Sequence, residues 1–307
     1  MNFIISSSAK ATASVSQVHP GNPGDDFRTP FRPSWMSVAT DLACRWILRL
    51  FMLVSILFLI SPLISVALTA FNAPPVMSFP PAQWSLDSFR QIPDNWYVAF
   101  ETSLELAACA AVIGMVITVP AAFALVRGLL PGRTMLEAFF RSPLQIPQIV
   151  LSVSIYQYYV VLQNLSGGNF LGGFFGLLIA HVLLVAPYIL STMLNKIGEI
   201  NPSVEEASEG LGASQRRTFF RITLPLVRPA LTAAAILAFV ISFDNVTLSL
   251  FLSADASNST LPVTLFSAIE LSASPVIFAA ATLTIVISMV ITVIIERLVG
   301  LRSTVGH

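Results

Sequence analysis

Long apolar stretches separated by polar segments run along most of the chain, and six of them are long enough to cross a membrane. A helix needs about 20 mostly apolar residues to cross about 30 Å of hydrocarbon. The stretches are too long and continuous for the strands of a membrane β-barrel, which alternate over about 10 residues. We therefore predict an all-α integral membrane protein with six transmembrane helices. The expected spans are Leu50–Phe71, Thr102–Val126, Leu144–Leu162, Leu171–Leu194, Ala230–Leu252 and Val276–Ile295.

The composition supports a membrane protein. Of the 307 residues, 55% are hydrophobic and only 10% are charged, whereas about 25% are charged in soluble domains. The mean hydropathy is +0.79. These values exclude an ordinary soluble enzyme, a disordered chain and a nucleic-acid-binding protein. The 16 basic and 16 acidic residues balance, and two cysteines cannot form a disulfide framework.

Lys and Arg residues gather in alternate loops, and this asymmetry predicts the orientation of the chain. Fifteen of the 16 basic residues fall on the side of the two termini, and Arg90 is the exception. Basic loops remain in the cytoplasm of membrane proteins. We therefore expect both termini to be cytoplasmic, which agrees with an even number of spans.

The same pattern divides the chain into four parts. Residues 1–45 are rich in Ser, Pro, Gly and Asn and predict a disordered cytoplasmic tail. Residues 46–99 hold the first span and a Pro-rich periplasmic loop. Residues 100–297 form the core, with five spans and a long cytoplasmic loop at 196–228. Residues 298–307 are a short cytoplasmic tail.

The loop Lys196–Arg228 has a local pattern of its own. Asn201 is a good N-cap and Pro202 fits a first helical turn. Gly212 can supply the left-handed residue that ends this helix, and Ser214 can cap a second short helix. The loop therefore predicts a short helix lying across the cytoplasmic face. Its apolar positions, spaced i, i+3 and i+7, are Val204, Ala207 and Leu211.

The loop also resembles a known motif. The residues that carry the resemblance are Glu206, Ala207, Ser208, Gly212, Ile222, Leu224 and Pro225. They are similar to the EAA motif of the permease subunits of binding-protein-dependent ABC importers of type I. Ser208 departs from the usual Ala, but it is small and should preserve docking. In that family the loop forms a coupling helix that inserts into a groove of the ATPase subunit.

The resemblance implies the fold of a type I importer permease, a location in the bacterial inner membrane, and three kinds of partner. These partners are a cytoplasmic ATPase dimer, a second homologous permease and a periplasmic substrate-binding protein. The chain itself has no phosphate-binding loop, since neither Lys10 nor Lys196 follows a glycine. ATP hydrolysis is thus expected in a separate subunit. We expect no cofactor, no catalytic residue and no metal site in this chain.

Further local features are similar to the spermidine/putrescine branch of these permeases. The features are Ser142-Pro143 with Ile146-Pro147, His181 with Pro187, Ser242 to Asn245, and Thr260 to Val263. The chain departs from the branch at Gln148 and Asn245, where acidic residues are common. These departures leave a polyamine, an opine-like amine, an amino-acid derivative or a metal chelate as possible substrates.

Three polar residues within the expected spans are candidate substrate-pathway residues: Asp244, Asn245 and His181. A carboxylate in a span is costly unless it faces protein or water. Asp244 would attract a cationic amine in a water-filled path, or it would form hydrogen bonds that hold helices together. His181 would line the pathway or act as a hydrogen-bonding residue between helices.

The main alternative function is an ion-gradient-driven secondary transporter or channel, with Asp244 as the coupling carboxylate. Such carriers often contain inverted repeats, and the sequence has no convincing repeat. That alternative also leaves the motif at 206–225 unexplained. A membrane-embedded enzyme would need paired catalytic groups, which the sequence lacks.

The orientation is testable by cysteine labelling. In a chain with Cys44 and Cys109 replaced by alanine, single cysteines placed in Asn72–Tyr97 or Ser253–Pro275 should react with an impermeant thiol reagent on intact spheroplasts. Both segments are poor in Lys and Arg and are expected to be periplasmic. A single cysteine in Lys196–Arg228 is the control and should react only after permeabilisation. The opposite labelling pattern would reverse the topology.

Overall fold

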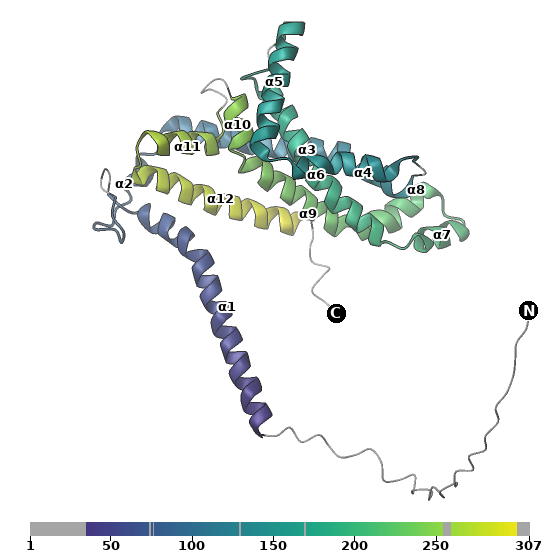
Figure 1. Cartoon of the computed structure of the whole chain (residues 1–307), viewed down its shortest axis with the longest axis horizontal. Coiled ribbons are helices and arrows are strands. Elements are labelled where there is room, and N and C mark those ends of the chain that lie inside the picture. Colours follow the sequence, from purple (N-terminus) through teal and green to yellow (C-terminus); the bar gives the residue numbers. More distant parts are fainter. Residues whose placement is uncertain are drawn as a thin grey trace, which may run out of the picture. The chain divides into compact units, whose positions relative to one another are not determined.

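The computed structural model describes residues 35–73, 75, 77–128, 130–168, 170–253 and 259–299. They fall into two compact units, one ending at Ile60 and the other beginning at Ser61. Within the described residues the secondary structure is helical apart from one isolated bridge between Asn72 and Trp84, which confirms the all-α fold class (Figure 1). The elements are α1 (Trp35–Thr69), α2 (Asp87–Arg90), α3 (Asp94–Arg127), α4 (Arg133–Arg141), η1 (Ser142–Gln145), α5 (Gln148–Ser166), α6 (Phe174–Glu199), α7 (Pro202–Gly210), α8 (Gln215–Thr218), η2 (Phe219–Thr223), α9 (Leu224–Phe243), α10 (Thr247–Leu252), α11 (Leu261–Leu271) and α12 (Pro275–Val299).

Most of α1 forms the first unit. The helix begins at Trp35, so residues 35–45 are helical and not part of a disordered tail, as the sequence had suggested. The rest of that expected tail lies outside the described residues. Nearly all side chains from Cys44 to Ile60 are exposed within this unit, as expected of a helix surrounded by lipid. Pro62 lies at the boundary of the two units, where it removes one backbone hydrogen bond from the helix.

Among the described residues, five helices are long and apolar enough to cross a membrane. They are Cys44–Thr69, Asp94–Arg127, Phe174–Glu199, Gln215–Phe243 and Pro275–Ile294. The expected third span is different. Its first residues lie in η1, and α5 begins only after Pro147. The 19 residues of α5 include several Gln and Tyr side chains, which lower its hydropathy, so the count of six spans stays a prediction.

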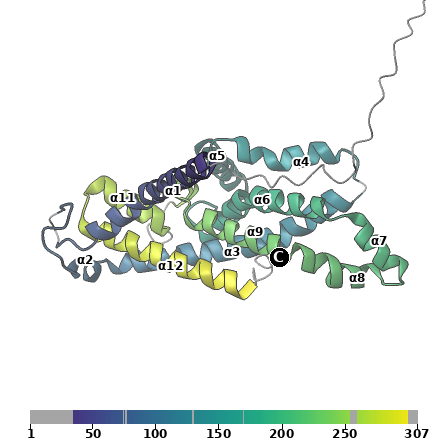
Figure 2. The same cartoon turned by 90° about the horizontal axis from the view of Figure 1, so that it is seen from below.

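Three helices, α3, α6 and α9, pack side by side and form the centre of the second unit (Figures 1 and 2). Small residues let the backbones of α3 and α6 approach closely, as in many membrane proteins. A Cβ atom at Gly114 of α3 would lie 2.9 Å from Ile189 Cδ1 and 3.0 Å from Val185 Cγ2 of α6. The fully buried members of this cluster include Ala107, Ala122, Val185, Ile189, Met193, Ile197, Val227 and Ala238.

A second apolar cluster joins α5 and α10 to α3 and α6. α5 rises away from the three central helices in Figure 1, and Tyr159 connects it to the start of α6. The Tyr159 hydroxyl donates a hydrogen bond of 2.9 Å to the carbonyl of Gly176. A side chain at Gly176 would collide with the backbone of Phe170, so glycine is needed there for close approach.

The segments expected to be periplasmic contain helices that the sequence did not predict. α3 begins at Asp94, ahead of the expected Thr102. α11 lies within Ser253–Pro275, which was expected to be a loop. Its first residue is tied to α3, because the backbone N–H of Leu261 donates to Ser103 Oγ at 2.8 Å. The chain therefore fixes the start of α11 through a buried side chain.

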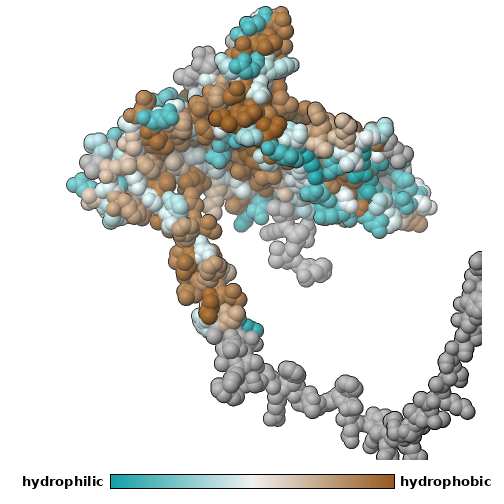
Figure 3. All heavy atoms as spheres, viewed as in Figure 1, coloured by the Kyte–Doolittle hydropathy of each residue, from teal (hydrophilic) through white to brown (hydrophobic). Residues whose placement is uncertain are grey.

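Hydrophobic and hydrophilic side chains separate along the second unit. In Figure 3 the hydrophobic colours gather over α5, whereas hydrophilic colours gather at the end where α7 lies. This distribution fits an apolar region within the membrane and a polar end outside it. The loop singled out by its sequence lies at that polar end.

The close contact of α3 and α6 predicts that a larger side chain at Gly114 destabilises the protein. Gly114→Val should lower the stability of the purified protein by about 1–3 kcal/mol, because the added atoms overpack against Val185 and Ile189. The measurement is thermal unfolding in detergent. Gly198→Ala in α6 is the matched control, since no atom lies within 4 Å of a Cβ atom there. An unchanged melting temperature for Gly114→Val would contradict the packing.

Candidate functional site

The helix at the start of the polar loop, α7, has the N-terminus that the sequence predicts. Asn201 Oδ1 accepts a hydrogen bond of 3.0 Å from the backbone N–H of Ser203, and Pro202 is the first helical residue. A helix start leaves several N–H groups without partners, and such a cap satisfies one of them. The expected cap is therefore confirmed.

The end of α7 is a left-handed turn at Gly212, whose φ is +88°. The N–H of Ala213 bonds to the Ser208 carbonyl (3.1 Å), and the N–H of Gly212 bonds to the Glu209 carbonyl (2.9 Å). This pair of bonds is the Schellman arrangement that ends many helices. No atom lies within 4 Å of a Cβ atom at Gly212. Glycine is thus favoured there by the backbone conformation and not by lack of space.

The chain then turns back through α8, η2 and α9. Ser214 Oγ accepts a hydrogen bond from the N–H of Arg217 (3.4 Å), which confirms the second predicted cap. The chain does not turn at Leu224-Pro225, since η2 continues directly into α9. η2 is a π-helical turn in which the N–H of Leu224 bonds to the carbonyl of Phe219. Pro225 lies in the first turn of α9, where its missing N–H is tolerated.

A shallow groove of ≈ 450 Å³ lies between α7 and the segment that follows it. Leu211 at the end of α7 is 91% exposed, and Val204 is also exposed. The predicted apolar stripe of α7 thus faces outward. The groove is lined by Val204, Ala207, Ser208, Leu211, Gly212, Ala213, Arg217 and Ile222.

The seven motif residues occupy different places in this loop. Ala207, Ser208, Gly212 and Ile222 line the groove. Glu206 and Pro225 are exposed, whereas Leu224 packs against the central cluster. The departure at Ser208 adds a contact, because its hydroxyl lies 3.0 Å from Thr218 Oγ1 of α8.

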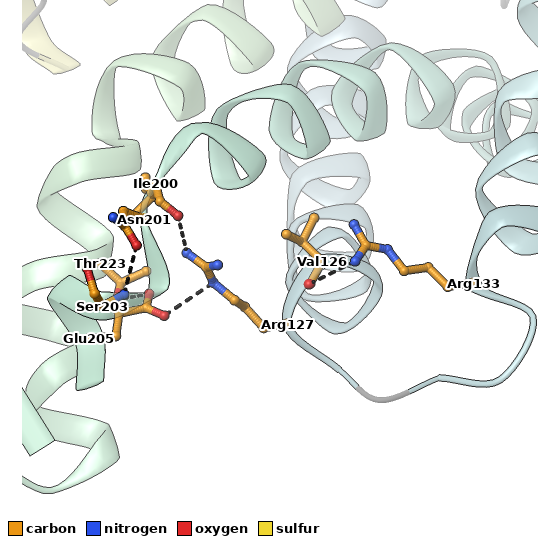
Figure 4. A network of polar contacts seen from close by, with 8 residues as sticks. All are labelled: Val126, Arg127, Arg133, Ile200, Asn201, Ser203, Glu205 and Thr223. Atoms are coloured by element: carbon orange, nitrogen blue, oxygen red, sulfur yellow. Dashed lines mark hydrogen bonds and ion pairs between the residues drawn. The ribbon is translucent and has the colours of Figure 1, made fainter. Parts of the chain in front are cut away.

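A network of polar contacts fixes α7 to its neighbours (Figure 4). Glu205 Oε2 lies 3.2 Å from Arg127 Nε at the end of α3. Glu205 Oε1 accepts a hydrogen bond of 2.7 Å from the Thr223 hydroxyl in η2. Arg127 also donates from a terminal nitrogen to the carbonyl of Ile200 (2.9 Å). Side-chain contacts therefore hold the loop against α3 and against the helical segment η2 that leads into α9.

Sequence reasoning missed this network. Neither Glu205 nor Arg127 was among the site residues that the sequence indicated. A signal for the pair was present, since Arg127 ends an apolar span and Glu205 begins the next cytoplasmic helix. Nothing in the sequence, however, indicates that these two segments meet.

The candidate pathway residue His181 is fully buried and bonded on both sides. Its Nδ1 lies 2.8 Å from Ser242 Oγ of α9, and its Nε2 lies 3.1 Å from Ser249 Oγ of α10. This geometry favours the hydrogen-bonding role between helices over a place in the pathway. Across the described residues, no three His, Cys, Asp or Glu side chains come together as metal ligands.

His181 bonds to both sides of a helix break. The expected continuous span Ala230–Leu252 is wrong, because α9 ends at Phe243 and α10 starts at Thr247. Asn245 is buried, and its Oδ1 accepts a hydrogen bond of 2.8 Å from the N–H of Leu248. Asn and Asp side chains compete with helical hydrogen bonds, which explains why the helix stops here despite its apolar flanks.

Asp244 differs from the other two candidate pathway residues, His181 and Asn245, since its side chain is exposed in this chain and theirs are buried. No ion pair in the described ranges involves it. The structure therefore gives no support to Asp244 as a link between helices of this chain. It lies at the end of α9, where the last backbone carbonyls carry a partial negative charge.

The sequence and the fold were compared with those of known proteins. The family model described as "Binding-protein-dependent transport system inner membrane component" matches residues 34–303. The putrescine transport system permease protein PotI of Escherichia coli (strain K12) is 30% identical over 235 residues, 76% of this chain and 83% of PotI. The spermidine/putrescine transport system permease protein PotC of Haemophilus influenzae is 30% identical over 245 residues, 80% of this chain and 93% of PotC.

A solved structure has a similar fold. It is the bacterial alginate ABC transporter in complex with alginate pentasaccharide-bound periplasmic protein. The superposition has a TM-score of 0.68 at 16% identity and covers 89% of this chain and 99% of that one. At this identity the likeness concerns the fold alone.

The comparisons confirm the expected family and its polyamine-permease branch. They also decide against a transporter driven by an ion gradient. The chain is a multi-pass inner-membrane protein and not an enzyme, since ATP hydrolysis in such importers belongs to a separate subunit. The chain belongs to the family of binding-protein-dependent transport system inner membrane components and is a permease subunit of an ABC importer.

Proposed function

We propose that this permease imports a small cationic amine, such as a polyamine, and that α7 and the groove beside it dock onto a cytoplasmic ATPase dimer. A second, homologous permease would complete the membrane part, and a periplasmic binding protein would deliver the substrate. The observation that carries the docking proposal is an exposed apolar surface on a helix that the chain itself holds in place.

The docking surface combines shape with apolar character. Leu211 exposes 91% of its surface at the polar end of the second unit. Covering this side chain with a partner would be favourable, because apolar surface would leave water. Small residues beside it, Ala207 and Gly212, leave room for the partner to approach. A central apolar side chain in a pocket with a polar rim is typical of protein interfaces. Arg217 at the edge of the groove supplies the rim.

In this proposal, closure of the ATPase dimer on ATP draws the two coupling helices of the permease pair together. The pair then turns from an inward-facing to an outward-facing arrangement and receives substrate from the binding protein. Hydrolysis of ATP resets it. Each step needs α7 to move with the membrane helices.

The cationic substrate is argued from the charge at the helix break. Asp244 is exposed at the C-terminal end of the 20-residue helix α9. The carboxylate and the helix end are both negative, so their fields add and attract a cation. Two relatives add support, since their names describe putrescine and spermidine/putrescine transport.

The docking proposal predicts that a negative charge placed at Gly212 weakens binding of the ATPase. Gly212→Asp should insert normally but lower ATPase binding and substrate-stimulated ATP turnover about tenfold or more, because an unpaired charge at a buried interface costs several kcal/mol. Gly212→Asn is the matched control, since Asn and Asp both tolerate a positive φ, and it should keep most of the turnover. Normal stimulation of the ATPase by Gly212→Asp in proteoliposomes would refute the docking role.

The substrate proposal predicts a loss of uptake when the carboxylate is removed. In the reconstituted importer, Asp244→Asn should lower uptake of labelled putrescine or spermidine roughly tenfold, because an ion pair at 4 Å is worth about 1–4 kcal/mol at a protein surface. Assembly should be unchanged. Glu270→Gln, an exposed carboxylate on α11, is the control. Robust uptake of an anion with no uptake of any cationic amine would overturn the proposal.

A further inference from the structure

Glu205 is the meeting point of three elements. One carboxylate oxygen lies 3.2 Å from Arg127 Nε of α3, and the other accepts the Thr223 hydroxyl of η2 at 2.7 Å. The side chains of Arg127 and Glu205 are only 24% and 20% exposed, and Thr223 is buried. Figure 4 shows Arg127 reaching from the end of α3 toward Glu205 at the start of α7.

The same arginine closes the corner between α6 and α7. Its terminal nitrogen donates to the carbonyl of Ile200, the residue that follows α6, at 2.9 Å. The end of α3 is itself held, since Arg133 donates to the carbonyl of Val126 at 3.3 Å. One guanidinium and one carboxylate thus connect the ends of α3 and α6 with α7 and η2.

This ion pair differs from the others in the part of the chain that the structure describes. The other three pairs, Arg90–Asp87, Arg141–Glu137 and Lys196–Glu199, each join residues three or four positions apart. Such local pairs stabilise their own helix. Only Arg127–Glu205 joins residues of different helices among these four.

We infer that Arg127, Glu205 and Thr223 are positioning residues that transmit movement of α7 to α3 and, through η2, to α9. The inference rests on the proposed docking of α7 onto the ATPase. Glu205 lies on the docking helix, yet its carboxylate is turned toward the permease and is already bonded there. Its two oxygens act on different helices, one on α3 and one on the helical run that leads into α9. Movement of α7 therefore pulls on both helices at once.

The test uses the complete importer, purified with its ATPase and second permease and supplied with its binding protein. Glu205→Gln keeps an acceptor for Thr223 but removes the charge that faces Arg127. Thr223→Val removes the hydroxyl and leaves the ion pair. Arg127→Gln removes the positive charge of the pair and leaves the Thr223 hydroxyl with its acceptor on Glu205. The matched control is Glu199→Gln, which breaks the exposed Lys196–Glu199 pair within α6.

Three quantities separate transmission from simple folding: co-purification of the ATPase, substrate-stimulated ATP turnover, and substrate uptake. The first two variants should keep the ATPase bound while stimulated turnover and uptake fall about 2- to 30-fold, the range of couplings carried by such networks. Arg127→Gln should lose at least as much turnover as Glu205→Gln, because each variant breaks the same ion pair, and Glu199→Gln should behave as the wild type.

The inference is overturned if Glu205→Gln and Thr223→Val transport normally, or if Arg127→Gln behaves as the wild type. It is also overturned if ATPase binding falls in step with turnover, because the network would then only build the docking surface. Gly212→Asp identifies a failure of the underlying proposal: if that variant keeps the ATPase bound and active, α7 is not the docking helix. Should Glu205→Gln fail to insert, Thr223→Val carries the same test.

Discussion

Away from water, every backbone N–H and C=O group must find its partner within the protein, and this constraint shapes the helix ends of the permease. Where α10 begins, Asn245 Oδ1 accepts the N–H of Leu248. Where α11 begins, Ser103 Oγ accepts the N–H of Leu261. Asn245 and Ser103 therefore mark places where one helix stops and the next begins. The break between α9 and α10 follows this rule.

At the polar end of the second unit, a short helix must be stabilised in water. α7 has only nine residues, and a helix of that length is unstable by itself in water. Its position depends on the caps at Asn201 and Gly212 and on the side-chain contacts of Glu205. The polar face of α7 is used for attachment to the permease, which leaves its apolar residues exposed. An exposed Leu211 is thus a consequence of how α7 is attached and not a packing defect.

The features that could be predicted from the sequence are those that depend on neighbouring residues. Apolar stretches gave the main spans, and the caps of Asn201 and Ser214 and the turn at Gly212 each involve residues within five positions. The Arg127–Glu205 pair could not be predicted, because it depends on how α3 and α7 meet in space. The break after Phe243 was missed since apolar residues on both sides mask two polar ones. α11 was missed because its 11 residues are too few to stand out as a span.

One consequence follows from the absence of a break between α8 and α9. The helical run Gln215–Phe243 has 29 residues, which corresponds to a rod about 44 Å long at the α-helical rise, with bends expected at the π-helical turn η2 and at Pro229. One end of this rod borders the groove beside α7, and the other end carries Asp244. A rod behaves as a lever: tilting it by about 10° about one end moves the other by about 8 Å at this length. The size of a carboxylate is small beside that displacement. In the mechanism proposed for the permease pair, a slight tilt imposed in the cytoplasm would therefore be enough to change which groups the Asp244 carboxylate faces.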